Sequence, residues 1–374
     1  AFAEYGRRAD IALCSIMRPC IKTSTSRRRE VVGLIGKLLF EAVQIPGPSG
    51  HEGRVAAWME DKLRPHVDEV WRDRAGNVIG KREGKNSQKS LMLAAHMDEV
   101  SLVVKSVSDV VRFEVVGWID PRTLLGSPVL VLARDGDIPG VIRSTSAHLA
   151  EAGGEVELWV DTGSRTSDVG IGDPIVFATN PRWLSPDERI LASHAIDDRI
   201  GLCVLVEVAK KLTEQPECDI YYVATVQEEV GGYGAVFAAG EIKPTWAIAI
   251  DTAFASDPAL PENPPLDSGP VVRRFVMSQP KGPLYPPSIL FSSALLGDTM
   301  VESARKQGLP VNEDINCRTF TDACRIFDAH PDIACLPFLI PRRYSHSPYE
   351  VVDVRNADIT AQIVIGALPF IFAS

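Results

Sequence analysis

The sequence predicts an α/β protein whose mixed sheet belongs to a large domain interrupted by a small all-β, barrel-like module. Short apolar runs alternate with helical patterns on both sides of the chain's middle, which is typical of a buried sheet covered by helices. Between about residues 99 and 180 the runs become short and β-branched, are divided by Gly, Asp and Pro, and lack a helical period. A length of 374 residues suits one large domain and one smaller domain.

The boundaries follow from these changes in pattern. We expect residues 30–98 and 181–374 to form the α/β domain and residues 99–180 to form the inserted β domain. Residues 1–29 carry seven basic and two acidic residues, so we treat them as an N-terminal extension outside the fold. This composition is found both in organellar transit segments and in basic tails of bacterial proteins, so organellar targeting is an alternative to a cytoplasmic location.

The first part of the α/β domain should contain two helices, a hairpin and a strand. An amphipathic helix is predicted over 29–40, and a second helix ends near Leu63. Residues 71–84 read as a hairpin with its turn at Ala-Gly-Asn. The continuous apolar run at 90–95 predicts a buried parallel strand that ends at His96.

The second part should begin with a helix from Asp198 that is apolar on nearly all sides and therefore buried. A strand at 220–227, a helix at 233–240 and a strand at 246–251 are predicted to follow. Residues 258–287 contain nine prolines, a density that argues against regular structure. We expect a surface loop there, with a pocket wall as the alternative because the segment follows an acidic strand end.

Composition excludes several classes of protein. The net charge is −10 and basic residues cluster only at the N-terminus, so no nucleic-acid partner is expected. No apolar run is long enough for a transmembrane helix, so no membrane partner is expected either. Seven scattered cysteines without a CxxC pair argue against a disulfide framework or a thiolate zinc site. Free thiols indicate a reducing compartment, and we predict the cytoplasm.

Acidic and imidazole side chains follow the predicted strands at the point where each strand ends. The carboxyl ends of strands in an open α/β sheet gather at one edge, where ligands bind. A further acid directly precedes the buried helix. These side chains are His96, Asp98, Asp197, Glu228, Glu229 and Asp251. Carboxylates crowded together repel one another and lose hydration, so the cluster predicts a bound cation.

The types of ligand narrow the choice of cation. Imidazole and carboxylate without thiolate suit Zn, Co or Mn better than Ca or Mg. The adjacent acids Glu228 and Glu229 suggest that one binds metal while the other moves protons. A hydrolase with two metals roughly 3.5–4 Å apart needs this division of labour. Spacing alone leaves open which glutamate has which role.

Five motifs in this order resemble the M42 family of metallo-aminopeptidases, which includes tetrahedral, glutamyl and deblocking aminopeptidases. The resemblance covers roughly residues 31–370. Weaker similarity lies in IPGPSGHE (45–52) and FTDA (320–323). The five motifs are HMDEV (96–100), AIDDR (195–199), QEEVGG (227–232), AIDTAFASDP (249–258) and RRYSHSPYEVV (342–352).

The resemblance implies a role for each matching residue. Two divalent metal ions would be bound. The first would be held by His96, Asp197 and Asp251, and the second by Asp197, Glu229 and His346. The catalytic residues would be Glu228, as general base, and Asp98, as the carboxylate that orients His96 through its other ring nitrogen. The metals implied are Zn or Co.

The resemblance also implies an activity and an assembly. The chain would hydrolyse N-terminal residues from peptides, and its β module would be a dimerisation domain in a large homo-oligomer, commonly a dodecamer. A related two-metal deacylase or carboxypeptidase is an alternative, and an inactive metal-stabilised assembly protein is an alternative from a different class. Glu228 argues against the latter, because a structural metal site has no use for a free carboxylate beside a ligand.

Some residues depart from the family's pattern near the ligands. Tyr233 stands where the family commonly has Arg, and Ser101 where it usually has Gly. Arg318 and Phe320 stand where small residues are usual. These departures leave the substrate preference open.

Three further histidines lie in loops or near the motifs. His51 follows the PGPSG loop, His148 lies in the β module, and His194 precedes Asp197 by three positions. Each is expected to be a structural or solvated residue, with contact to the site as the alternative.

Overall fold

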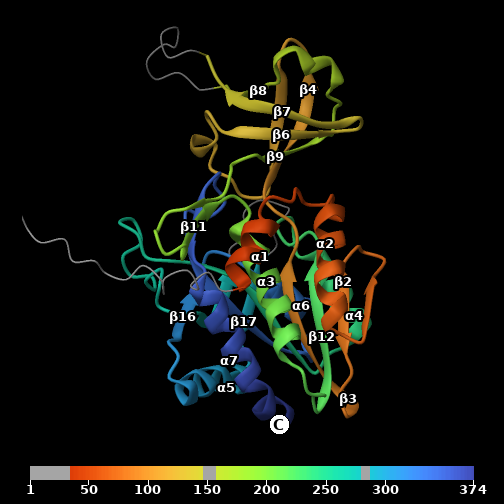
Figure 1. Ribbon diagram of the computed structural model, residues 1–374, viewed down its shortest axis with the longest axis vertical. Helices are drawn as coiled ribbons and strands as arrows, with labels where there is room; N and C mark the ends of the chain where they lie inside the picture. Colours follow the sequence, from red (N-terminus) through yellow and green to blue (C-terminus); the bar gives the residue numbers. More distant parts are fainter. Residues whose placement is uncertain (1–33, 146–156, 279–286) are drawn as a thin grey trace, which may run out of the picture.

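The computed structural model describes residues 34–145, 157–278 and 287–374, which form two domains (Figure 1). The larger domain contains a twelve-stranded mixed sheet with helices on both faces. The smaller domain is a closed six-stranded antiparallel barrel at one end of the molecule's long axis. The predicted α/β fold with an inserted β barrel is confirmed.

Seven helices are present in the described part of the α/β domain: α1 (Leu34–Ala42), α2 (Gly53–Leu63), α3 (Ile196–Lys211), α4 (Tyr233–Ile242), α5 (Ala294–Gln307), α6 (Asp322–Ala329) and α7 (Arg355–Phe372). Its strands are β1 (Glu69–Arg72), β2 (Val78–Arg82), β3 (Asn86–His96), β10 (Arg182–Trp183), β11 (Ile190–Ser193), β12 (Cys218–Thr225), β13 (Trp246–Phe254), β14 (Val271–Ser278), β15 (Ser288–Phe291), β16 (Asn312–Asn316), β17 (Ala334–Arg343) and β18 (Glu350–Asp353). The barrel consists of β4 (Ser101–Val107), β5 (Val111–Val116), β6 (Pro128–Ala133), β7 (Gly136–Arg143), β8 (Trp159–Asp161) and β9 (Pro174–Phe177).

The centre of the sheet is parallel and buried on both faces. Strands β12, β3, β13 and β17 are neighbours in that order, and each adjacent pair is parallel. Successive side chains of a strand point to opposite faces. Leu91 and Leu93 of β3 accordingly pack in the core with α1, α3 and α7, while Met92 and Ala94 pack in the core with α4 and α6. The continuous apolar run seen in the sequence follows from this double burial.

The pairing of β3 with β13 determines where the sheet opens. The two strands pair only from Trp246 to Ala249, whereas β13 continues alongside β17 as far as Phe254. We expected Asp251 to end its strand, and it lies within β13 instead. It nevertheless lies beyond the last residue paired with β3. Its side chain therefore shares the sheet edge with His96.

The proline-rich segment differs from its prediction. Val271–Ser278 forms β14, which pairs with β15, β16 and β17. The stretch from 271 to 279 contains no proline, so its backbone can donate hydrogen bonds in the sheet. Arg273 and Ser278 of β14 line the same pocket as His96 and Asp251. The alternative interpretation of this segment, a pocket wall, is confirmed.

Other elements lie close to their predicted positions. The described part of the first helix begins at Leu34, and α3 begins at Ile196, two residues before the predicted start. The first turn of α3 is irregular, because Asp197 and Asp198 have non-helical backbone angles. Within the described ranges no helix is long and apolar enough to cross a membrane. The domain boundaries at residues 98 and 181 stay a prediction.

Candidate metal centre

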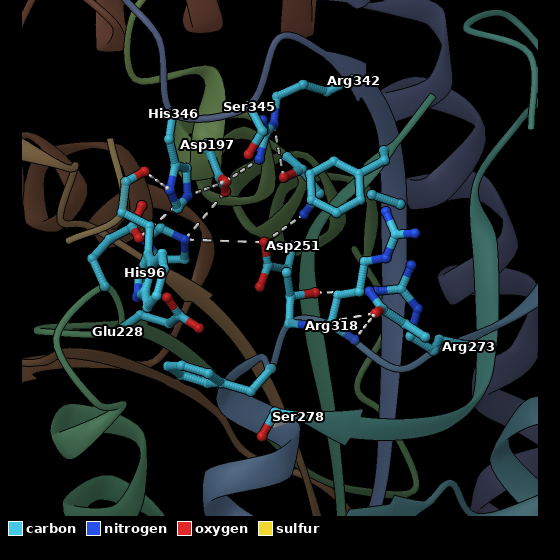
Figure 2. Close-up of a pocket in the computed structure, with 18 of the residues that line it drawn as sticks. His96, Asp197, Glu228, Asp251, Arg273, Ser278, Arg318, Arg342, Ser345 and His346 are labelled. Carbon is cyan, nitrogen blue, oxygen red and sulfur yellow. Dashed lines mark hydrogen bonds and ion pairs between the residues drawn. The ribbon is translucent and has the colours of Figure 1, made fainter. Parts of the chain in front are cut away.

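A cavity of about 310 Å³ opens at the carboxyl edge of β3 and β13 (Figure 2). All six predicted ligands and base residues line it, although they come from widely separated parts of the chain: His96, Asp197, Glu228, Glu229, Asp251 and His346. Asp98 is fully buried behind them. The structure therefore brings these side chains together, His96 from a strand end and Asp251 from within β13.

Asp197 lies between the two imidazoles. Its Oδ1 is 3.3 Å from His96 Nε2, and its Oδ2 is 3.5 Å from His346 Nε2. On the outer sides, Asp251 Oδ1 lies 4.0 Å from His96 Nε2, and Glu229 Oε2 lies 3.3 Å from His346 Nε2 (Figure 2). One carboxylate therefore presents one oxygen to each half of the cluster, as a ligand shared by two cations must.

The donor set fits divalent metal ions. Nitrogen and oxygen ligand atoms that lie within 4.8 Å of one another form two groups, one of His96, Asp197 and Glu229 and one of His96, Asp198 and Asp251. Such N/O sites without sulfur suit borderline cations such as Zn²⁺ and Co²⁺. Burial and neighbouring acids raise the pKa of Glu229 to about 7 and that of Asp251 to about 8. Bound cations would relieve this crowding of buried negative charge.

Both imidazoles present Nε2 to the cluster and are held through Nδ1. His96 Nδ1 lies 3.1 Å from the Asp98 carbonyl oxygen and 3.5 Å from the Asp98 carboxylate, so the carbonyl is the closer partner. His346 Nδ1 donates to the carbonyl oxygen of Trp118 at 2.7 Å. A donor at Nδ1 leaves Nε2 with a free lone pair, which is what a metal ligand requires.

The Trp118 contact comes from the barrel domain. This residue follows β5, and it also lines the cavity. The inserted domain thus fixes the ring of His346. Sequence reasoning did not predict this contact, because a backbone carbonyl carries no signal in residue type.

Asp98 holds the turn that carries the two glutamates. Its Oδ1 accepts a hydrogen bond from the backbone N–H of Glu228 at 2.9 Å, and its Oδ2 accepts one from Glu229 at 3.2 Å. Ser49 Oγ donates to the same Oδ2 at 2.6 Å. Burial, together with Asp251 and Glu229, raises the pKa of Glu228 well above its usual value, although His96 opposes this shift. Neither ligand group contains Glu228.

Arg342 and Glu350 form a second buried support that sequence reasoning missed. Arg342 pairs with Asp197 and, at 3.1 Å, with Glu350. Glu350 accepts hydrogen bonds from the backbone N–H groups of Asp197 and His346, each at 2.9 Å. Burial would raise the pKa of Asp197, but Arg342 and the two imidazoles hold it well below its usual value. Both residues lie in the 342–352 motif, from which only His346 was assigned.

The remaining candidates lie apart from the cavity or have structural partners. His51 is exposed and is not among the cavity-lining residues. His194 is buried, and its Nδ1 lies 2.8 Å from Thr179 Oγ1. His148 lies outside the described residues. Asp198, which the sequence analysis did not assign, accepts hydrogen bonds from the backbone of His96 and Gly201.

The fold and the site together define a two-domain metallohydrolase. A family model described as M42 glutamyl aminopeptidase matches residues 76–363. The chain belongs to the M42 peptidase family, and it is a metal-dependent hydrolase of the aminopeptidase type.

Individual relatives span nearly the whole chain. A lysyl aminopeptidase of Pyrococcus furiosus is 32% identical over 87% of this chain and 94% of its own length. The structure of aminopeptidase APDkam598 from Desulfurococcus kamchatkensis is similar, with a TM-score of 0.81 and 32% identity over 89% of this chain and 94% of that one. The TET1 peptidase of Pyrococcus horikoshii, which can assemble into a tetrahedron or a large octahedral shell, has a TM-score of 0.78 and 28% identity over 89% of this chain and 99% of that one.

Proposed function

We propose that this chain removes N-terminal residues from peptides with two divalent metals and a glutamate base. One metal would be held by His96, Asp197 and Asp251, and the other by Asp197, Glu229 and His346. The observation that carries the proposal is the position of Asp197, which faces an imidazole with each of its oxygens. The chemistry of the donor set favours Zn or Co.

Glu228 is proposed as the general base. It lies in the cavity beside the proposed ligand Glu229, and the family resemblance gives it no metal, so its carboxylate would be available for proton transfer. Bound metals would polarise the scissile carbonyl and lower the pKa of the attacking water. Glu228 would take the proton of that water and deliver it to the leaving nitrogen. Asp98 is fully buried outside the cavity lining and accepts a hydrogen bond from the Glu228 backbone, so it would position the base without touching substrate.

Assembly and location are further proposals. Since the TET1 relative assembles into closed shells, we infer that this chain forms a large homo-oligomer, with a dodecamer expected from the family resemblance. The barrel would be its dimerisation domain. A cytoplasmic location is supported by free cysteines, four of which are buried among the described residues: Cys203, Cys218, Cys324 and Cys335.

The test compares free and blocked N-termini. Metal-reconstituted protein is assayed on aminoacyl-nitroanilides, on the same substrates with an N-acetyl group, and after chelation. The proposal expects hydrolysis of the free amines only, with activity lost on chelation and restored by Zn or Co. Removal of the acetyl group would favour the deacylase alternative, and cleavage of an N-acetyl dipeptide with a free C-terminal carboxylate, assayed alongside, would favour the carboxypeptidase alternative. No hydrolysis with any metal would favour the inactive assembly protein.

A further inference from the structure

Three arginines line the cavity, and two of them have carboxylate partners. Arg342 pairs with Asp197 and Glu350, as described above. Arg273 makes a two-pronged contact with Asp314, in which Nε and Nη2 donate to the two carboxylate oxygens at 2.9 and 2.8 Å. Arg318 is different, because no carboxylate in the described parts of the chain pairs with its guanidinium. The cavity therefore contains one arginine whose charge is not matched by an acid.

The backbone that carries Arg318 is held in place. Arg318 lies between β16 and α6, two residues after Asn316, whose side chain is buried. Asn316 Oδ1 accepts hydrogen bonds from the backbone N–H of Arg318 at 2.6 Å and of Thr319 at 3.3 Å. Asn316 Nδ2 donates to Thr319 Oγ1 at 2.7 Å. The loop is therefore braced from within, so the starting point of the Arg318 side chain is fixed.

The position of Arg318 relative to the metal centre gives it a function. In Figure 2, Arg318 and Arg273 lie on one side of Asp251, and His96 and Glu228 lie on the other. A substrate whose scissile bond is at the metal centre must place its N-terminal side chain in the remaining space of the cavity. Phe254 and Phe320 line that cavity too, which suits the methylene groups of a side chain with a polar end.

We propose that Arg318 selects peptides with an acidic N-terminal residue, glutamate above all. A guanidinium binds a carboxylate through two parallel hydrogen bonds, and it repels an ammonium group. Family membership alone does not decide the preference, since the family model is described as glutamyl and a relative as lysyl. The inference rests on the proposed aminopeptidase function.

The test measures kcat/KM of the metal-loaded enzyme on glutamyl-, leucyl- and lysyl-nitroanilide. We expect the glutamyl substrate to be preferred. Arg318→Leu should lower kcat/KM for it by about 10- to 100-fold, while the value for the leucyl substrate changes by less than about threefold. Arg318→Glu should shift the preference toward the lysyl substrate, and Arg318→Lys should keep part of the original preference. Arg274→Leu is the matched control, because Arg274 pairs with Glu313 and Asp298 and does not line the cavity.

A binding measurement separates selection from turnover. In the Glu228→Gln variant, calorimetric titration with a glutamyl peptide and a leucyl peptide should show tighter binding of the former, and Arg318→Leu should abolish the difference. A wild-type enzyme that hydrolyses leucyl or lysyl substrates in preference to glutamyl would overturn this inference and leave the aminopeptidase proposal standing. Equal losses on all three substrates in Arg318→Leu would also overturn it. Absence of hydrolysis of every aminoacyl substrate would overturn the proposed function itself.

Discussion

Replacing Asp98 by Asn tests whether this buried carboxylate holds the base in place. The substitution keeps the size of the side chain but exchanges one oxygen for an N–H₂ group. Asp98 Oδ1 accepts from the Glu228 backbone, while Oδ2 accepts from both the Glu229 backbone and Ser49. Whichever way the amide is turned, its N–H₂ group faces at least one donor. Loss of the charge also weakens the hydrogen bonds that remain.

The size of the effect follows from these contacts. A hydrogen bond to a charged group contributes about 1.5–3 kcal/mol, so losing one at the Glu228–Glu229 turn should lower kcat/KM by about 10- to 150-fold. The Asp98 carboxylate also lies 3.5 Å from Nδ1 of His96. Loss of such a partner to a metal-ligating histidine typically lowers metal affinity by about 10- to 100-fold.

The assay measures both quantities in one protein. Metal affinity is obtained by competition with a chromogenic chelator, and kcat/KM is measured at saturating metal. Ser49→Ala is the matched control, because it removes one hydrogen bond to Oδ2 and keeps the charge of Asp98. We expect its effect on both values to be smaller than that of Asp98→Asn. If Asp98→Asn leaves both values within twofold of the wild type, the positioning role is wrong.

Two further predictions concern stability. Arg199→Met should reduce the free energy of unfolding in urea by about 3–5 kcal/mol. The Arg199 guanidinium contacts Glu99 at 3.2 Å and the Met97 carbonyl oxygen. Its removal leaves the Glu99 carboxylate buried without a cation. Arg199→Met combined with Glu99→Gln should lose less, and an equal or larger loss would contradict this explanation. Burial lowers the pKa of His194 from 6.5 to about 3. Between pH 6.5 and pH 3 the unfolded chain therefore binds more protons than the folded chain, and the free energy of unfolding falls as the pH drops. His194→Gln should therefore reduce the loss of stability between pH 7 and pH 5 by about 2 kcal/mol, and an unchanged slope would refute the assignment.

The sequence predicted that several of these side chains meet in one cavity because they follow strands with a strong apolar signal. His96 ends β3, and the Glu228–Glu229 turn lies just beyond β12, so the edge of the sheet had to bring them together. Asp251 shows the limit of that reasoning. Its strand continues to Phe254 because β17 goes on pairing with it, and the length of a partner strand cannot be read from the sequence of β13.

The supports of the site were harder to predict. The backbone carbonyl of Trp118, in the barrel domain, accepts a hydrogen bond from His346, which lies 228 residues later in the chain. Every residue has a backbone carbonyl, so the sequence does not indicate this contact. Arg342 and Glu350 had a visible signal, because they lie in the same motif as His346. Their pairing depends on the register of β17 against β18, which places Arg342 opposite Val352. Strand β14 was not predicted because the proline content was judged over residues 258–287 as a whole. The strand itself, Val271–Ser278, contains no proline.

Glu228→Gln, with metal content and turnover measured on the same sample, tests the proposed roles of the two adjacent glutamates. The variant should bind two metals per chain with unchanged affinity and lose about 10²–10⁴-fold in kcat. Glu229→Gln should instead weaken metal binding. A Glu228→Gln enzyme with near-normal kcat, or one that no longer binds its metals, would contradict the division of these adjacent glutamates into base and ligand.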